Sequence, residues 1–169
     1  MPMAGVLTVS DRCARGERQD GAGPRLCARL ARLGFRVGWY EIVPDEPRLL
    51  VKALDDMVAS GYALVVTTGG TGLGPRDRVP DVLDRWADGS VPGLGERMRA
   101  VGAARNPRAA LSRGGAWFRG RTLIVAVPGS PAGAEESLDA VADVLLHGVD
   151  VLAGADHLPA SPAAGGSHR

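Results

Sequence analysis

The amino-acid sequence predicts an α/β fold of three layers, in which helices cover both faces of a mostly parallel, doubly wound sheet with one antiparallel hairpin. Over residues 6–67, three strand-like runs alternate with two helical stripes, which is the pattern of a βαβαβ unit. Right-handed crossovers make the strands of such a unit parallel. Two further strand-like runs flank Gly120 and Arg121, the spacing of a tight hairpin turn.

The expected strands are short runs rich in Val, Ile, Leu and Thr. Runs of this kind are typical of strands that are buried on both faces of a sheet. We place the strands at residues 6–10, 35–43, 62–67, 116–119 and 122–127, of which the last two form the hairpin.

Each expected helix combines an apolar stripe with a boundary signal. Leu26, Leu30 and Leu33 recur at i, i+4 and i+7 before Gly34, which predicts a helix that ends there. The other predicted helices follow residues 44–47 up to Ser60, begin at Pro80, span residues 92–104 with Met98 and Val101 inward, and span residues 131–147 with Ala134, Leu138, Val141, Ala142 and Leu145 inward.

Length and composition indicate one domain. The 169 residues suffice for a single core, which we assign to residues 1–153, whereas residues 154–169 have little to bury and are expected to form a flexible tail. The net charge of +1 gives no reason to bind nucleic acid or a membrane surface, so a small-molecule partner is expected. No signal peptide or membrane span is recognisable, and two isolated cysteines fit a reduced cytoplasm.

A glycine-rich turn follows the third strand, where open α/β sheets bind their ligands. Four glycines in residues 67–74 (TTGGTGLG) can bring backbone amides close to an anion. The turn is not a P-loop, because it has no lysine, and a dinucleotide-binding motif would follow the first strand instead. The segment therefore predicts a phosphate cradle, and a sharp turn that lets a helix pack closely is the alternative.

Two aspartates are expected at the same edge of the sheet. Asp45 follows the second strand and Asp77 follows the glycine turn. Two carboxylates beside a phosphate cradle suggest Mg²⁺ held by Asp oxygens and substrate phosphates. The alternatives are that Asp45 caps the following helix and that Asp77 pairs with Arg76 and Arg78 on the surface.

Other polar residues follow the first and last strands. Gly129 and Ser130 form a small-residue turn before a helix, which can accept a phosphate, or Ser130 is simply the helix cap. Ser10 and Asp11 end the first strand, and Asp20 is either part of the site or a turn former. None of the three His is near this edge, so serine or cysteine hydrolase chemistry is not expected.

Taken together, these motifs resemble the MogA/MoaB-like molybdenum-cofactor family over about residues 4–153. They appear in the family's order: LTVSDR at 7–12, VPDE at 43–46, TTGGTG at 67–72, Arg76-Asp77, PG at 92–93, LSR at 111–113 and PGSP at 128–131. The resemblance implies a molybdopterin adenylyltransferase, which forms adenylyl-molybdopterin and pyrophosphate from molybdopterin and ATP. It also implies a homotrimer and a molybdate-inserting protein as recipient of the product.

The resemblance also implies roles for individual residues. The essential acidic positions match Asp45 and Asp77, which would hold Mg²⁺ and the phosphates. The nucleotide-binding positions match Thr68, Gly69, Gly70, Thr71, Gly72, Gly129 and Ser130, and the pterin side matches Ser10, Asp11, Asp20 and Ser112.

This chain departs from the family pattern at two points. Arg78-Val79 replaces the usual V-T before Pro80, and Ala22 replaces a serine. A protein that binds molybdopterin or its adenylate without turnover is therefore an alternative function. Molybdate insertion, the activity of a sister branch, ranks last because that branch normally carries further domains.

Overall fold

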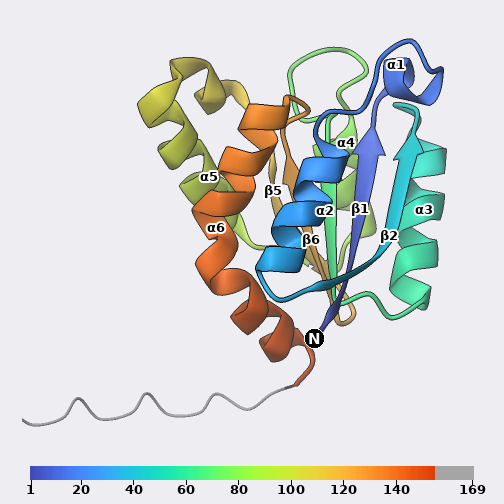
Figure 1. The fold of residues 1–169 in the computed structure, drawn as a ribbon, viewed down its shortest axis with the longest axis vertical. Helices are drawn as coiled ribbons and strands as arrows, with labels where there is room; N and C mark the ends of the chain where they lie inside the picture. The colour runs from blue at the N-terminus through green and yellow to red at the C-terminus, as the bar shows by residue number, and fades with distance from the viewer. Residues whose placement is uncertain (155–169) are drawn as a thin grey trace, which may run out of the picture.

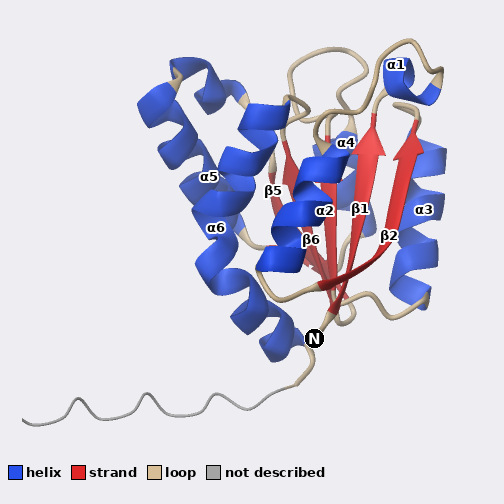
Figure 2. Cartoon of the chain, in the orientation of Figure 1, coloured by secondary structure: helices blue, strands red, loops and turns tan. Residues whose placement is uncertain are grey.

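The protein forms a six-stranded sheet between two layers of helices (Figures 1 and 2). A computed structural model describes residues 1–154, and the tail predicted for residues 154–169 lies outside this range from residue 155 onward. The sheet order is β2-β1-β3-β6-β5-β4. β1, β2, β3 and β6 are parallel, whereas β5 runs antiparallel to β6 and β4 runs antiparallel to β5. The predicted fold class is confirmed.

The strands lie close to their predicted positions. Their observed bounds are β1 Met3–Val9, β2 Arg36–Val43, β3 Leu64–Thr68, β4 Gly89–Ser90, β5 Gly115–Arg119 and β6 Thr122–Val127. Every residue of β3 and β6 is buried, as expected for central parallel strands with helices on both faces. The two-residue β4 is an addition that no sequence pattern indicated.

The helices divide between the two faces of the sheet. Their bounds are α1 Asp11–Ala14, α2 Gly23–Arg32, α3 Pro47–Ala59, α4 Val79–Trp86, α5 Pro92–Arg105, the 3₁₀ helix η1 Pro107–Leu111 and α6 Pro131–Leu152. Side chains of α2, α5 and α6 pack in one apolar cluster, and those of α3 and α4 pack in the other. The clusters therefore form the two interfaces of a three-layer sandwich.

Two helical predictions need correction. Val101 was predicted to face inward, yet it is 40% exposed, because the inward stripe of α5 is made by Gly95, Met98 and Gly102. A methyl group on Gly95 would lie 3.0 Å from the carbonyl oxygen of Gly114, so glycine here permits close packing of helix and strand. The last helix also continues beyond residue 147 to Leu152, with Val149 buried.

The chain order creates a switch point between β1 and β3. From β1 the chain crosses to β2 on one side, and the next strand, β3, returns to the other side of β1. Ligands of doubly wound sheets bind outside the carboxyl ends of strands at such a point, because the following loops diverge there. Within the described residues, no helix is both long and apolar enough to cross a lipid bilayer.

Candidate active site

Two turns meet at the carboxyl ends of β3 and β6. Gly69 and Gly70 have φ angles of +96° and +66°, which glycine adopts readily. The Thr68 hydroxyl donates to the carbonyl of Pro128 at 2.7 Å, and the amide of Gly69 donates to the carbonyl of Val127 at 3.2 Å. The turn after β3 is therefore tied directly to the turn after β6.

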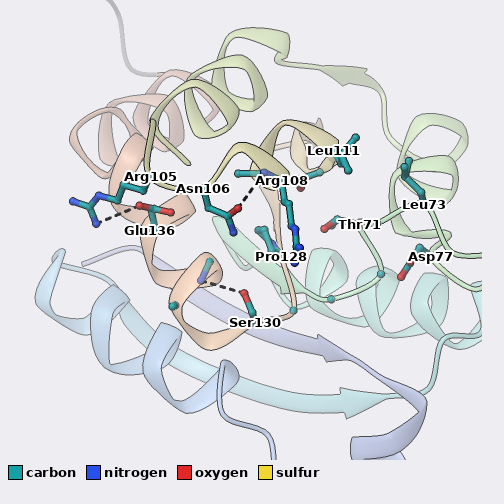
Figure 3. A pocket seen from close by; sticks show the side chains of 18 residues that line it. Thr71, Leu73, Asp77, Arg105, Asn106, Arg108, Leu111, Pro128, Ser130 and Glu136 are labelled. Carbon is teal, nitrogen blue, oxygen red and sulfur yellow. Dashed lines mark hydrogen bonds and ion pairs between the residues drawn. The ribbon is translucent and has the colours of Figure 1, made fainter. Parts of the chain in front are cut away.

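The two turns form the wall between two cavities. The larger cavity, of about 820 Å³, extends toward α5, η1 and the start of α6 (Figure 3). The smaller, of about 360 Å³, extends toward the loop after β1. Both are lined by Gly69, Gly70, Asp77, Gly129 and Ser130. Most of the predicted phosphate-binding residues therefore share one wall.

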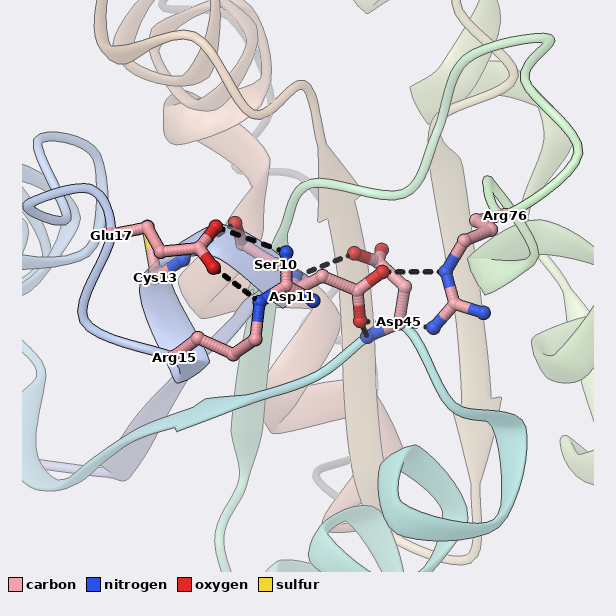
Figure 4. Close-up of polar contacts among 7 residues, drawn as sticks. All are labelled: Ser10, Asp11, Cys13, Arg15, Glu17, Asp45 and Arg76. Carbon is pink, nitrogen blue, oxygen red and sulfur yellow. Dashed lines mark hydrogen bonds and ion pairs between the residues drawn. The ribbon is translucent and has the colours of Figure 1, made fainter.

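Asp45 is held in place by a reciprocal pair of hydrogen bonds with Asp11. The amide of Asp11 donates to Asp45 Oδ2 at 2.8 Å, and the amide of Asp45 donates to Asp11 Oδ1 at 3.0 Å (Figure 4). Arg76 binds both oxygens of Asp11 and lowers the pKa of that carboxyl through its hydrogen bond. Asp45 does not cap α3, whose N-cap residue is Glu46, so the capping alternative is wrong.

The electrostatic setting of Asp45 opposes its ionisation. Burial raises the pKa of the Asp45 carboxyl, and the charges of Asp11 and Asp77 raise it further. No hydrogen bond within residues 1–154 reaches its second oxygen, Oδ1, which lies on the side of Gly70. An ionised carboxylate in this position favours a bound cation.

Asp45→Asn is expected to stabilise the folded protein. Because the pKa of Asp45 is raised in the folded state, ionisation of this carboxyl favours the unfolded chain. The stability that the carboxyl contributes is fully present below its ordinary pKa of 3.8, and it is lost as pH rises through the raised pKa. At pH 7.5 the variant should therefore unfold at a higher temperature than the wild type. The advantage should vanish as pH falls toward 3.8. Thermal unfolding of both proteins across this range measures it, and a lower melting temperature of the variant at pH 7.5 contradicts the electrostatic account.

Asp77 faces the cavities rather than the surface arginines. Its Oδ2 accepts from the amide of Gly74 at 2.8 Å, and no hydrogen bond within the described chain reaches its Oδ1. Arg76 pairs with Asp11 and Arg78 approaches Asp81 at 3.8 Å, so the alternative in which these arginines neutralise Asp77 is wrong.

The two aspartates fit a magnesium ion that is completed by substrate. Each commits one oxygen to a backbone amide, and both line the smaller cavity. No group of three or more His, Cys, Asp or Glu side chains in residues 1–154 forms a complete metal cage. Mg²⁺ bound through one or two carboxylates together with substrate phosphates needs no such cage.

The residues predicted for the pterin side are distributed over several places. Ser10 and Asp20 line the smaller cavity, Ser112 lines the larger, and Asp11 braces Asp45 and Arg76. Ser10 also caps α1, and Ser130 caps α6 by accepting from the amide of Gly133 at 3.2 Å. A pterin that contacted Ser10 and Ser112 together would have to reach across the shared wall.

Asp20 is a structural anchor as well as a cavity residue. It accepts hydrogen bonds from the hydroxyls of Thr8 and Tyr40, each at 2.6 Å, and from the amides of Ala22 and Gly23, each at 3.0 Å. Burial opposes its ionisation, but these hydrogen bonds lower its pKa overall. Its carboxylate therefore fixes the start of α2 against β1 and β2.

The sequence analysis assigned no role to Arg113. It also assigned none to the side of the larger cavity that is formed by the end of α5 and by η1, which we call the α5–η1 wall. Arg113 donates to the carbonyls of Gly72 and Asp77 and pairs with Asp81, so it holds the glycine turn and Asp77 in one arrangement. The LSR motif at residues 111–113 was the only signal for it. The wall contributes Arg105, Asn106 and Arg108, which had no motif at all.

The same fold and sequence features occur in known proteins. A sequence profile described as "probable molybdopterin binding domain" matches residues 5–147. The molybdopterin adenylyltransferase of Helicobacter pylori strain 26695 is 38% identical over 153 residues, which cover 89% of this chain and 87% of that protein. The corresponding protein of Escherichia coli K12 is 36% identical over 152 residues, which cover 86% and 78%.

Two further relatives define the extent of the match. The molybdenum cofactor biosynthesis bifunctional protein of Synechococcus elongatus is 38% identical over 91% of this chain, but the chain spans only 48% of that protein, about half its length. The crystal structure of the molybdopterin biosynthesis enzyme MoaB from Thermus thermophilus has a TM-score of 0.86 at 50% identity and covers 91% of this chain and 98% of its own. The chain thus belongs to the MogA/MoaB-like family of molybdopterin-binding domains.

Proposed function

We propose that this protein is a molybdopterin adenylyltransferase, which transfers AMP from Mg-ATP to molybdopterin and releases pyrophosphate. The observation that carries the proposal is the wall of glycine turns and Asp77 that two adjoining cavities share. Two phosphate-bearing substrates on either side of this wall would place their phosphates against the same amides. The relatives named molybdopterin adenylyltransferase support the assignment of the two substrates.

The reaction requires positioning rather than a protein nucleophile. A phosphate oxygen of molybdopterin forms a bond to the α-phosphorus of ATP while the bond from that phosphorus to the bridging oxygen breaks, and pyrophosphate leaves in line. The amides of residues 69–72 and 129–130 would orient the phosphates, and Asp45 and Asp77 would hold the metal. A bound Mg²⁺ supplies charge neutralisation for the phosphates during this transfer.

We assign the nucleotide phosphates to the two turns that form the shared wall, and the pterin to polar residues on both sides of that wall. The nucleotide residues are Thr68, Gly69, Gly70, Thr71, Gly72, Gly129 and Ser130, and the pterin residues are Ser10, Asp11, Asp20 and Ser112. Asp11 and Asp20 would act mainly through the backbone that they hold, because their oxygens accept hydrogen bonds from the protein.

The departures from the family pattern lie beside the cavities rather than in them. Arg78 reaches toward Asp81, and Ala22 is buried, with its amide bonded to Asp20. Val79, in the place of the family's threonine, packs against Gly70 of the shared wall, where a Cβ on Gly70 would lie 2.6 Å from Val79 Cγ2. None of these three side chains lines the two cavities that meet at the shared wall. This placement favours a working enzyme over a protein that only binds molybdopterin.

The purified protein is expected to release pyrophosphate when it is supplied with molybdopterin, ATP and Mg²⁺. A coupled pyrophosphate assay measures the reaction, and omission of molybdopterin or chelation of the divalent ion should stop it. Binding of both substrates without pyrophosphate would support the non-catalytic alternative. A thermal-shift experiment without stabilisation by ATP, AMP or molybdopterin would count against both functions.

The family resemblance supplies the remaining parts of the proposal. They are assembly as a homotrimer, a cytoplasmic location and delivery of the adenylate to a molybdate-inserting protein. Light scattering on the purified protein tests the first of them, with three times the 17.5 kDa chain mass as the expected result.

A further inference from the structure

The α5–η1 wall of the larger cavity carries two arginines with different surroundings. Arg105 Nη1 lies 3.2 Å from Glu136 Oε1, so its charge is balanced by a carboxylate in the same cavity. The guanidinium of Arg108 has neither a carboxylate partner nor a hydrogen bond within residues 1–154. Figure 3 shows its side chain reaching from η1 into the cavity toward Pro128. Arg108 is therefore an exposed cation whose charge no group of residues 1–154 neutralises.

The backbone that carries Arg108 is held against the glycine turn. The side-chain oxygen of Asn106 accepts from the amide of Arg108 at 3.1 Å and caps η1. Just after η1, the amide of Arg113 donates to the carbonyl of Thr71 at 2.8 Å. A fixed point on each side of the residue thus keeps the arginine in the lining of the cavity that Gly69 and Gly70 also line.

The ligand that suits both sides of this cavity is a phosphate group. Backbone amides in a turn of positive φ bind anions, and a guanidinium binds two oxygens of one phosphate in a planar fork. Resting on the proposed function, we propose that Arg108 is a substrate-binding residue that holds a phosphate of one substrate in the larger cavity, opposite the glycine turn. The phosphate belongs either to the nucleotide or to molybdopterin, which share this chemistry.

Steady-state kinetics of Arg108→Ala and Arg108→Lys test the role. In Arg108→Ala, the KM of the substrate whose phosphate is held should rise roughly ten- to a hundredfold, the worth of a charge-assisted hydrogen bond. The kcat of Arg108→Ala should change by no more than about threefold, because the substitution leaves the positions of Asp45 and Asp77 unaltered. Arg108→Lys should recover part of the loss, since it keeps the charge but not the fork.

Arg121→Ala is the matched control. Arg121 lies in the β5–β6 turn, at the end of β6 opposite the site, and removing it changes the net charge equally. Its two KM values should stay at the wild-type level. An equal increase in both variants would indicate a general charge effect and overturn the proposal.

The two sources of phosphate give different outcomes. A higher KM for ATP alone assigns the nucleotide to Arg108, and a higher KM for molybdopterin alone assigns the pterin phosphate. Unchanged KM values for both substrates overturn the proposal.

Calorimetric titration with inorganic pyrophosphate separates this proposal from the proposed function. The wild type could bind pyrophosphate yet form none from ATP, and Arg108→Ala could bind pyrophosphate more weakly than the wild type. This result would support the role of Arg108 and contradict the adenylyltransferase activity. If the wild type is active and Arg108→Ala matches it in both kinetics and titration, the proposed function stands and the role of Arg108 is overturned.

Discussion

Asp77→Asn is expected to lower kcat for pyrophosphate release at least about a hundredfold while the protein stays folded. The amide oxygen of asparagine can still accept from Gly74, so the turn retains the hydrogen bond that Asp77 Oδ2 makes at 2.8 Å. The group that replaces Oδ1 is an NH₂, which carries no negative charge and repels a cation. The variant therefore removes a metal ligand with little change of shape.

Asp84→Asn is the control for this substitution. Asp84 Oδ1 accepts from Trp117 Nε1 at 2.8 Å, and its side chain lines neither cavity of the site. Its turnover should equal that of the wild type. Pyrophosphate assays measure turnover, and thermal unfolding shows whether each variant is folded. Full activity in folded Asp77→Asn would contradict the assignment of Asp77 as a metal ligand, but not the assignment of the chain to its family.

Gly69→Ala is expected to destabilise the protein by roughly 3 kcal/mol or more, the combined effect of a steric clash and an unfavourable backbone angle. A Cβ atom at this position would lie 2.2 Å from the carbonyl oxygen of Val9. Val9 cannot retreat easily, because it ends β1 in the interior of the sheet, paired with Val43 of β2. The positive φ of +96° adds roughly 1–2 kcal/mol for a residue with a side chain. A fall of about 6–12 °C in Tm is the expected result.

Gly61→Ala separates the two costs. Gly61 also has a positive φ, +77°, but a Cβ there would meet no atom of residues 1–154 within 4 Å. Its Tm should fall less, by about 2–8 °C, the conformational cost of roughly 1–2 kcal/mol alone. Equal losses in the two variants would show that the contact with Val9 contributes nothing.

The fold was predictable wherever a periodic pattern ran for several residues. The alternating strands and stripes and the Gly120-Arg121 turn led to the observed sheet and hairpin. The elements that sequence reasoning missed, α1, β4 and η1, have two to five residues and show no period. Val101 misled because α5 packs through glycines, and a hydrophobicity pattern contains no signal for a buried glycine.

The candidate site was predictable in position but not in its connections. The rule that strand ends collect ligands brought Asp45, Asp77 and both glycine turns to one place. Their hydrogen bonds join residues far apart in sequence, such as Asp11 and Arg76, and no spacing rule predicts such pairs. The roles of the individual residues stay predictions until variants are measured.

The approach of Gly129 to Gly69 limits how this protein can diversify. A methyl group on Gly129 would lie 3.2 Å from the Cα atom of Gly69, so neither loop can enlarge unless its neighbour retreats. New substrate preferences in proteins built this way should therefore originate in the outer residues between α5 and β5, where Arg108 and Leu111 are exposed. The contact between Gly69 and Gly129 should vary little among related proteins, and the residues between α5 and β5 should vary with the substrate.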